Sequence, residues 1–311
     1  MNQIFKYIGY SKQAFHQKMD RQHREHEQHL LLLPIVAQLR KEHPGVAARQ
    51  LYFILQPENI GRDKFERLCF EYGFKLERLR SFSRTTNSTG VIRFPNLTAG
   101  IEFTHINQAW SSDITYYQIG NTFYYLTFIL DLFSRTIVGF SVSKRLLTEQ
   151  TTLPALKMAL AQRNPEAGLI FHSDGGGQYY CKAFLELTKE HQFKNSMCDI
   201  VYENAHAERI NGTIKNQYLK GYNPQNYSSL MDMTKRAVNN YNMVRPHLAL
   251  KNLPPAAYEK LLPAGGTALS NYDFCNFSNQ AGQHRKNHNL STRSVLKQKS
   301  KKSVEKKVNV F

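Results

Sequence analysis

This sequence is short of acidic residues, cysteines and long apolar runs, and each shortage excludes a class of protein. Its 24 Asp and Glu stand against 41 Lys and Arg, which leaves a formal net charge of +17. A chain this basic is expected to bind an acidic partner, either nucleic acid or an anionic membrane. The longest apolar runs, residues 30–33 and 123–130, are too short to cross a bilayer. Nucleic acid is therefore the favoured partner.

Cysteine scarcity bears on redox chemistry and on zinc. The four cysteines, Cys69, Cys181, Cys198 and Cys275, are far apart and form no CxxC pair. We therefore expect reduced thiols rather than a disulfide framework or a zinc domain. Histidines at 23, 26 and 29 recur along a polar helix, which is more typical of a solvated face than of a metal site. The first residues lack the apolar core of a signal peptide, which predicts a cytoplasmic protein.

Residues 1–90 are basic and have helical spacing. Apolar residues predict two short helices on either side of the turn at 43–45, and a third helix over 62–74. These helices carry Arg49 and Arg62 and fit a helix-turn-helix-like DNA-binding region, although a plain helical bundle with a charged face fits equally well. The loop-like composition of residues 81–90 ends this region, and we place a linker at 91–104.

Residues 105–262 have the pattern of an α/β layer. Three β-rich runs predict strands over 110–117, 123–130 and 137–142. A helix over 148–163, a short strand over 169–171 and helices over 184–190, 205–219 and 230–242 follow. Strands followed by alternating helices predict a mixed sheet flanked by helices. Residues 263–311 lose the apolar pattern, and we expect a disordered basic tail that attracts phosphates.

Three acidic residues stand beside three different elements of the predicted layer. Asp113 lies within a strand, Asp174 follows one, and Glu208 lies on a helix. Each also has a plainer alternative role. Asp113 could end a turn before the strand, Asp174 could belong to a turn before three glycines, and Glu208 could be an exposed helix residue. Yet a charge inside an apolar strand is costly to bury alone, and the glycines let the backbone approach a ligand closely.

Carboxylates aimed at one point are what two Mg²⁺ ions, or Mn²⁺ in their place, need beside a DNA phosphate. We therefore predict Asp113, Asp174 and Glu208 as the catalytic metal ligands of a two-metal site. Asp131, at a strand end, is kept in reserve as a further acid.

Helical spacing places Asn204, Glu208, Asn211 and Lys215 on one face. A carboxylate, two amides and a lysine in a row suit metal and phosphate binding, so we predict that Asn204, Asn211 and Lys215 contact DNA. We predict DNA contacts for Arg49 and Arg62 in the N-terminal region as well.

Arg245, in the segment YNMVRPHLAL at 241–250, is a further predicted DNA contact. For this arginine, bracing the end of the preceding helix is an equally good alternative.

Five ordered segments carry a family resemblance: SDITY at 112–116, YYLTFILDLFSRTIVGFSVS at 124–143, HSDGGGQY at 172–179, ENAHAERINGTIK at 203–215 and YNMVRPHLAL at 241–250. They resemble the OrfB-type transposases of bacterial insertion sequences, members of the DDE superfamily that share their core with retroviral integrases. The resemblance covers residues 30–260. It implies a ribonuclease-H-like fold, a two-metal active site and DNA cleavage with strand transfer.

Within that resemblance, Asp113, Asp174 and Glu208 match the three catalytic acids, and Lys215 matches a basic position that in the family touches the element's terminal DNA. Two departures occur. Between Asp174 and Glu208 lie 33 residues, slightly fewer than is usual, and Glu203 stands where the family has Asp. We interpret both as subfamily variation.

The resemblance implies a DNA transposase that nicks the element end to free a 3′-OH and joins it to a second phosphodiester. The alternatives are a metal-dependent nuclease of the same fold without strand transfer, and a non-catalytic domesticated DNA-binding protein. Its expected partners are the element's terminal repeats, target DNA, further copies of the chain, and an upstream OrfA protein or a frameshift fusion with it. Such a protein would associate with the nucleoid.

Overall fold

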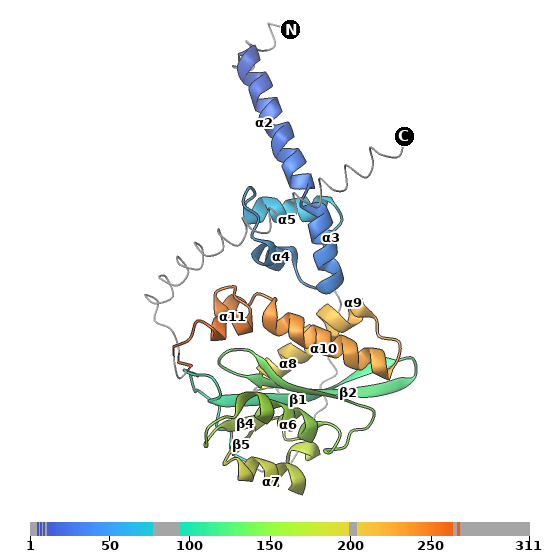
Figure 1. Cartoon of the computed structure of the whole chain (residues 1–311), viewed down its shortest axis with the longest axis vertical. Coiled ribbons are helices and arrows are strands. Elements are labelled where there is room, and N and C mark those ends of the chain that lie inside the picture. Colours follow the sequence, from blue (N-terminus) through green and yellow to red (C-terminus); the bar gives the residue numbers. More distant parts are fainter. Residues whose placement is uncertain are drawn as a thin grey trace, which may run out of the picture. The chain divides into compact units, whose positions relative to one another are not determined.

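The computed structural model describes residues 11–76, 94–198 and 204–263, together with residues 5, 7, 9, 266 and 267 (Figure 1). Contacts divide the chain into two compact units, Met1–Tyr258 and Glu259–Phe311. The loop predicted at 81–90 lies outside the described residues, and so does almost all of the predicted basic tail. The domain boundaries predicted from the sequence stay predictions.

Four helices open the described chain: α2 (Lys12–Leu30), α3 (Leu33–Glu42), α4 (Ala48–Leu55) and α5 (Arg62–Glu71). The last three confirm the short helices predicted from apolar spacing. α2 is polar along its length, but His29 near its end is only 5% exposed, so the three histidines do not form a uniformly solvated face. Among the described helices, none is both long and apolar enough to cross a membrane.

The centre of the fold is a five-stranded sheet with the order β3-β2-β1-β4-β5. Its strands are β1 (Ala109–Ile119), β2 (Thr122–Asp131), β3 (Ile137–Ser143), β4 (Ile170–Ser173) and β5 (Lys194–Met197). β1, β2 and β3 are antiparallel neighbours, whereas β4 and β5 run parallel to β1. This mixed sheet confirms the predicted ribonuclease-H-like fold. β5 was not predicted, because the sequence KNSM contains no apolar run.

Helices flank the sheet on both faces. They are α6 (Thr152–Arg163), α7 (Lys182–Glu190), α8 (Ala205–Gly212), α9 (Lys220–Tyr222), α10 (Tyr227–Met243) and α11 (Pro255–Glu259), with short turns η1 (Gly177–Tyr179) and η4 (Leu248–Leu250). The single helix predicted over 205–219 is wrong in detail. It changes at Thr213 into a π-helical segment, η3 (Thr213–Leu219). Local widening of this kind is frequent at functional sites.

Alternation along the strands builds two separate cores. Trp110 and Ile129 pack with α6 and α7, whereas Ala109 and Phe128 pack on the opposite face with α8, η3 and α10. A period of two places successive side chains on opposite faces, so every second residue of β1 faces α8 and η3. Asp113 and Thr115 belong to that set.

The turn predicted at 43–45 packs against η3 and α9. The backbone N–H of Gly45 donates to the carbonyl of Gln217 at 2.7 Å. There is no room for side chains here: a Cβ on Gly45 would lie 2.4 Å from Gln217 Cα, and one on Gly221 would lie 2.3 Å from Pro44 Cβ. The hydroxyl of Tyr222 also donates to the carbonyl of Glu42. The short helices and the helix of the predicted site therefore share a tightly packed joint.

Candidate active site

α8 and η3 run along β1 and contact it at successive positions. Asn204, at the start of α8, donates from Nδ2 to the carbonyl of Ser112 at 3.0 Å. Asn211 Nδ2 donates to Asp113 Oδ2 at 2.7 Å, and Lys215 Nζ donates to Thr115 Oγ1 at 2.9 Å. The three side chains therefore share one helical face, as their spacing predicts, and this face lies against the strand that carries Asp113.

Asp174 lies just beyond β4, in a loop shaped by glycine. Gly175 has φ +76°, a conformation that residues with a side chain rarely adopt, and a Cβ there would also lie 2.1 Å from the Met197 methyl group, which would have to move. The N–H of Gly176 donates to Asp174 Oδ1 at 3.0 Å and turns the carboxylate back over the loop. β1 and β4 are parallel neighbours whose pairing ends at Ser112 and Ser173. Asp113 and Asp174 are therefore the first residues beyond that shared ladder.

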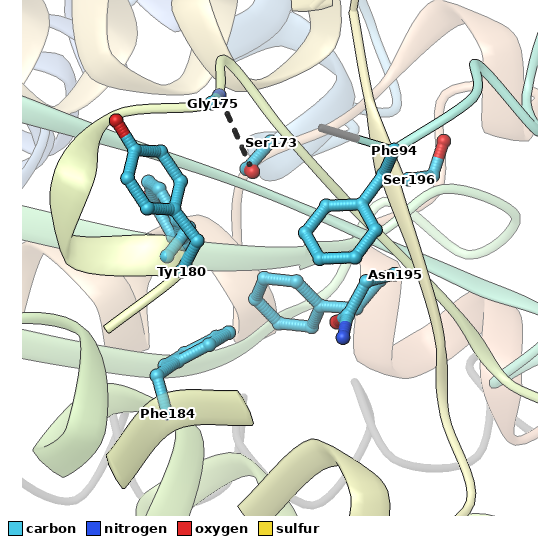
Figure 2. Close-up of a pocket in the computed structure, with 9 residues that line it drawn as sticks. Phe94, Ser173, Gly175, Tyr180, Phe184, Asn195 and Ser196 are labelled. Carbon is cyan, nitrogen blue, oxygen red and sulfur yellow. Dashed lines mark hydrogen bonds between the residues drawn. The ribbon is translucent and has the colours of Figure 1, made fainter. Parts of the chain in front are cut away.

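Aromatic side chains line a small pocket next to the loop that follows β4. Figure 2 shows Phe94, Tyr180 and Phe184 around the loop, and the N–H of Gly175 donating to Ser173 Oγ at 3.4 Å. The enclosed cavity is about 10 Å³, the size that holds a single water molecule. This pocket is too small for a substrate.

Burial and like charge both act on Asp113. Burial, followed by the nearby charge of Asp174, raises the pKa of its carboxyl to about 7, and Glu208 adds a smaller effect in the same direction. The hydrogen bond from Asn211 opposes these effects. The pKa of Asp174 is also raised, mainly by the protein atoms around it, although the residue lies at the surface. Asp113 is thus close enough to both other predicted acids for their negative charge to disfavour its ionised form.

Glu208 is the most loosely placed of the three acids. Its side chain is exposed on α8, and its charge is felt at Asp113. Lys215 is a cation that interacts with Asp113. Burial lowers the pKa of its ammonium, whereas Asp113 raises it. A single lysine beside three carboxylates leaves the site negatively charged, the electrostatic condition under which divalent cations bind.

The donor set suits Mg²⁺, which prefers carboxylate and amide oxygens. Asn211 contributes a second observation: its Oδ1 atom is buried and has no hydrogen-bond partner in the described part of the chain. Within the same residues, no group of three or more His, Cys, Asp or Glu is already close enough to hold a metal ion. The acids therefore fit the cation by chemistry, and drawing Glu208 inward would complete the set.

Other predicted residues have protein partners. Arg49 pairs with Glu66 at 3.3 Å, and Arg62 pairs with Asp63 at 2.9 Å, both on the exposed surface. These contacts leave their DNA-binding role a prediction. Asn204 is 3% exposed and is held by Ser111 as well as by the Ser112 carbonyl, so its DNA contact also stays a prediction.

Arg245 donates to Gln217 Oε1 from Nη2 at 3.1 Å and lies 3.5 Å from His247 Nε2. The guanidinium therefore braces the chain after α10 against η3, which is the structural alternative raised by its sequence context. Contact with DNA stays a prediction for this residue too.

Sequence reasoning missed two polar residues that position β1. Ser112 Oγ donates to the carbonyl of Phe128 at 3.0 Å and lies 2.9 Å from the hydroxyl of Tyr179. Tyr179 is 4% exposed and belongs to the HSDGGGQY segment, so this contact ties the Asp174 segment to the strand of Asp113. Serine is too common a residue for its place beside Asp113 to have indicated this role.

Comparison with known proteins identifies the core. Residues 104–201 and 199–255 match two family descriptions, both "Integrase core domain". A 31 kDa protein of insertion element IS600 from Shigella sonnei is 32% identical over 258 residues, covering 81% of this chain and 94% of the relative. The putative transposase InsK of IS150 from Escherichia coli K12 is 30% identical over 196 residues, covering 61% and 67%.

Transposase InsF of IS3A from Escherichia coli K12 is 33% identical over 159 residues, covering 49% of this chain and 54% of the relative. Among solved structures, the magnesium complex of the HTLV-2 integrase catalytic core is 21% identical with a TM-score of 0.40, covering 49% of this chain and 95% of that one. The extent of the match to the IS600 protein and the two integrase core matches establish the family. The chain belongs to the DDE transposases of insertion sequences, enzymes built on an integrase core domain.

Proposed function

We propose that this transposase cuts DNA at the end of its element and joins the freed 3′-OH to a second phosphodiester, using two Mg²⁺ ions held by Asp113, Asp174 and Glu208. The observation that carries the proposal is the raised pKa of Asp113, because it reflects a buried carboxyl group with two further carboxylates close by. When bound, the ions would activate the attacking oxygen and stabilise the leaving oxygen.

The protein's own residues prepare this site. Asn211 orients the Asp113 carboxylate through its 2.7 Å hydrogen bond and lowers its pKa, which favours the ionised form that binds a cation. The glycine loop positions Asp174, and the unpartnered Oδ1 of Asn211 offers a further buried acceptor. These contacts hold two of the three acids before any ligand arrives.

Lys215 would bind the phosphate beside the cut. Its ammonium is fixed by Thr115, so little side-chain freedom is lost when a phosphate oxygen approaches. The resemblance of this position to the family's DNA-contacting lysine supports the same role. Arg49, Arg62 and Arg245 are proposed as weaker contacts, because each already donates to the protein partner described above.

Both chemical steps exchange one phosphorus–oxygen bond for another. In the first, a water oxygen attacks phosphorus, the bond to the 3′ oxygen breaks, and the water proton is lost to solvent while the 3′ oxygen gains one. In the second, that 3′ oxygen attacks another phosphodiester and releases a new 3′-OH. No oxidation is involved and no covalent enzyme intermediate is required.

The test uses labelled duplexes that carry the DNA flanking the gene. Asp113→Asn, Asp174→Asn and Glu208→Gln should each reduce Mg²⁺-dependent cleavage at least about 1,000-fold, with binding retained. Replacing Mg²⁺ by Mn²⁺ should preserve cleavage in the wild type. Retained cleavage in any variant removes that residue from the site. Cleavage without joined products would favour the nuclease alternative instead.

A complete reaction brings two element ends together, so we propose that several copies act jointly on terminal and target DNA. An upstream OrfA protein or a frameshift fusion is the further partner that the family resemblance implies. Co-expression of the upstream reading frame, followed by size measurement of the complex with DNA, tests both proposals.

A further inference from the structure

An exposed aromatic pair lies at the far end of the strand that carries Asp113. Tyr116 is 55% exposed and Phe123 is 45% exposed. Their rings meet edge to face, with centroids 5.5 Å apart and planes at 81°. The two residues face each other diagonally across the β1–β2 hairpin. In this geometry the edge of one ring meets the face of the other, and both side chains remain largely exposed to solvent.

The pair lies close to the proposed chemistry. Tyr116 follows Asp113 by three residues along β1, about 10 Å of extended strand, so its side chain leaves the opposite face of the sheet at the same open edge. The ladder between β1 and β4 ends at Ser112, and none of the described strands continues it past Asp113. The edge of β1 that leads from the acids to Tyr116 is therefore not covered by another strand.

A cation accompanies the aromatic pair. Lys215 Nζ lies 4.9 Å from the centre of the Tyr116 ring and 2.9 Å from Thr115 Oγ1. Stabilisation of the hairpin alone would explain an aromatic cross-strand pair, but it would require no lysine fixed over the ring. An apolar protein partner would be poorly served by the same charge. A flat π-surface next to a cation is the combination that binds one unpaired nucleotide, with its base on the ring and its phosphate at the ammonium.

We propose that Tyr116 stacks with an unpaired nucleobase of the DNA strand bound at the three acids, with Phe123 holding the tyrosine ring in place and Lys215 binding the adjacent phosphate. This inference rests on the proposed function. In a duplex each base is already paired and stacked, so only a frayed or overhanging base can lie on the ring. The pair therefore selects DNA whose strands have opened next to the cutting site.

Binding to two DNA probes tests the proposal in the full-length chain, with EDTA present to prevent cleavage. One probe is a duplex of the flanking DNA with a three-nucleotide overhang that contains 2-aminopurine, and the other is the matched blunt duplex. The wild type should bind the overhang probe about 5- to 100-fold more tightly and quench the fluorescence of the probe base. Tyr116→Leu should lose both effects, whereas Tyr116→Phe, which keeps the ring, should retain them.

Equal melting temperatures of the two variants will show that hairpin stability is not what is being measured. Lys215→Gln should weaken binding of both probes, because phosphates are present in each. An overhang preference that survives in Tyr116→Leu, or that is absent from the wild type, overturns the inference. If blunt DNA is still cut in Mg²⁺, only the stacking role is lost. A chain that neither binds nor cuts DNA loses the proposed function as well.

Discussion

Two aspartates on the neighbouring strands β1 and β2 have opposite surroundings. Asp131, where β2 turns toward β3, is fully buried and accepts backbone N–H bonds from Asn107, Phe133 and Ser134 at 2.6–2.9 Å. Asp113, on β1, has one side-chain donor and two carboxylates nearby. Asp131 was kept in reserve as a site residue, and its contacts instead make it the organiser of a turn.

The difference teaches how a carboxylate can be assigned from its surroundings. Where the protein supplies donors to both oxygens, the charge is satisfied and the residue stabilises the fold. Where like charges lie close together instead, their repulsion lowers the free energy of unfolding. A bound cation can restore it. The predictions below test this distinction, beginning with the largest expected change in stability.

Asp131→Ala should lower the free energy of unfolding by about 3 kcal/mol or more, because it leaves buried backbone N–H groups without acceptors. Urea denaturation followed by circular dichroism measures the change. Asp131→Asn is the matched control: it keeps one acceptor oxygen and should lose less. A loss below about 1 kcal/mol for the alanine variant would show that the turn does not depend on this carboxylate.

Asp113→Asn should have the opposite effect on stability, and the effect should depend on pH. The pKa of Asp113 is raised from 3.8 to about 7, so between these values the native state holds a proton that the unfolded chain has released. Wild-type stability should therefore fall as the pH rises from about 4 to about 7. The variant avoids this loss and should gain on the wild type by on the order of a few kcal/mol at pH 8.

Urea midpoints of both proteins in EDTA at pH 5 and pH 8 measure that gain. Added Mg²⁺ should stabilise the wild type at pH 8 and leave the asparagine variant almost unchanged, because the variant lacks one ligand. A constant difference between the two proteins across the pH range would contradict the assigned environment of Asp113.

Asn211→Leu should slow cleavage about tenfold, corresponding to one hydrogen bond of about 1.4 kcal/mol. The hydrogen bond from Asn211 lowers the pKa of Asp113, so its removal should shift the pH midpoint of cleavage at limiting Mg²⁺ toward alkaline values. A merely structural asparagine would change the rate without moving this midpoint. The pH–rate profile therefore distinguishes a positioning role from a packing role.

Glu42→Gln should have the smallest effect on stability. Glu42 is a third type of carboxylate, paired with an arginine at the surface. Its pair with Arg236, at 2.6 Å on a partly exposed surface, lowers the pKa of Glu42. The stabilisation is therefore present above pH 4.5 and disappears as the pH falls, the reverse of Asp113. Solvent screening should limit the loss to below about 1 kcal/mol, and salt should reduce it further. Cleavage should be unaffected.

The sequence indicated which polar residues lie on one helical face, but not which atoms they contact. Asp113 was recognisable because a charge inside an apolar strand needs an explanation, and the helical spacing of Asn211 and Lys215 predicted a shared face that the structure places against β1. That Asn211 donates to Asp113 depends on how a helix lies along a strand 98 residues away in the chain. Local pattern carries no information of that kind.

The errors in the fold have equally physical causes. β5 was missed because its side chains show no strand pattern in the sequence. Parallel pairing with β4 stabilises it instead. The π-helical stretch was missed because Thr213–Leu219 has the apolar spacing of an ordinary helix, and packing against β1 and α10 decides the wider turn. Both are tertiary effects that override local propensity.

The contact between Gly45 and Gln217 connects the short N-terminal helices rigidly to η3. Gln217 lies two residues beyond Lys215 on the same turn of η3, and its side chain also accepts a hydrogen bond from Arg245. A displacement of the turn that follows α3 should therefore move η3 as well. The two are joined by a backbone hydrogen bond and by close packing at Gly45 and Gly221. If the proposed DNA contacts at Arg49 and Arg62 hold, a pull on the short helices would therefore reach Gln217, two residues from Lys215, without passing through a flexible linker.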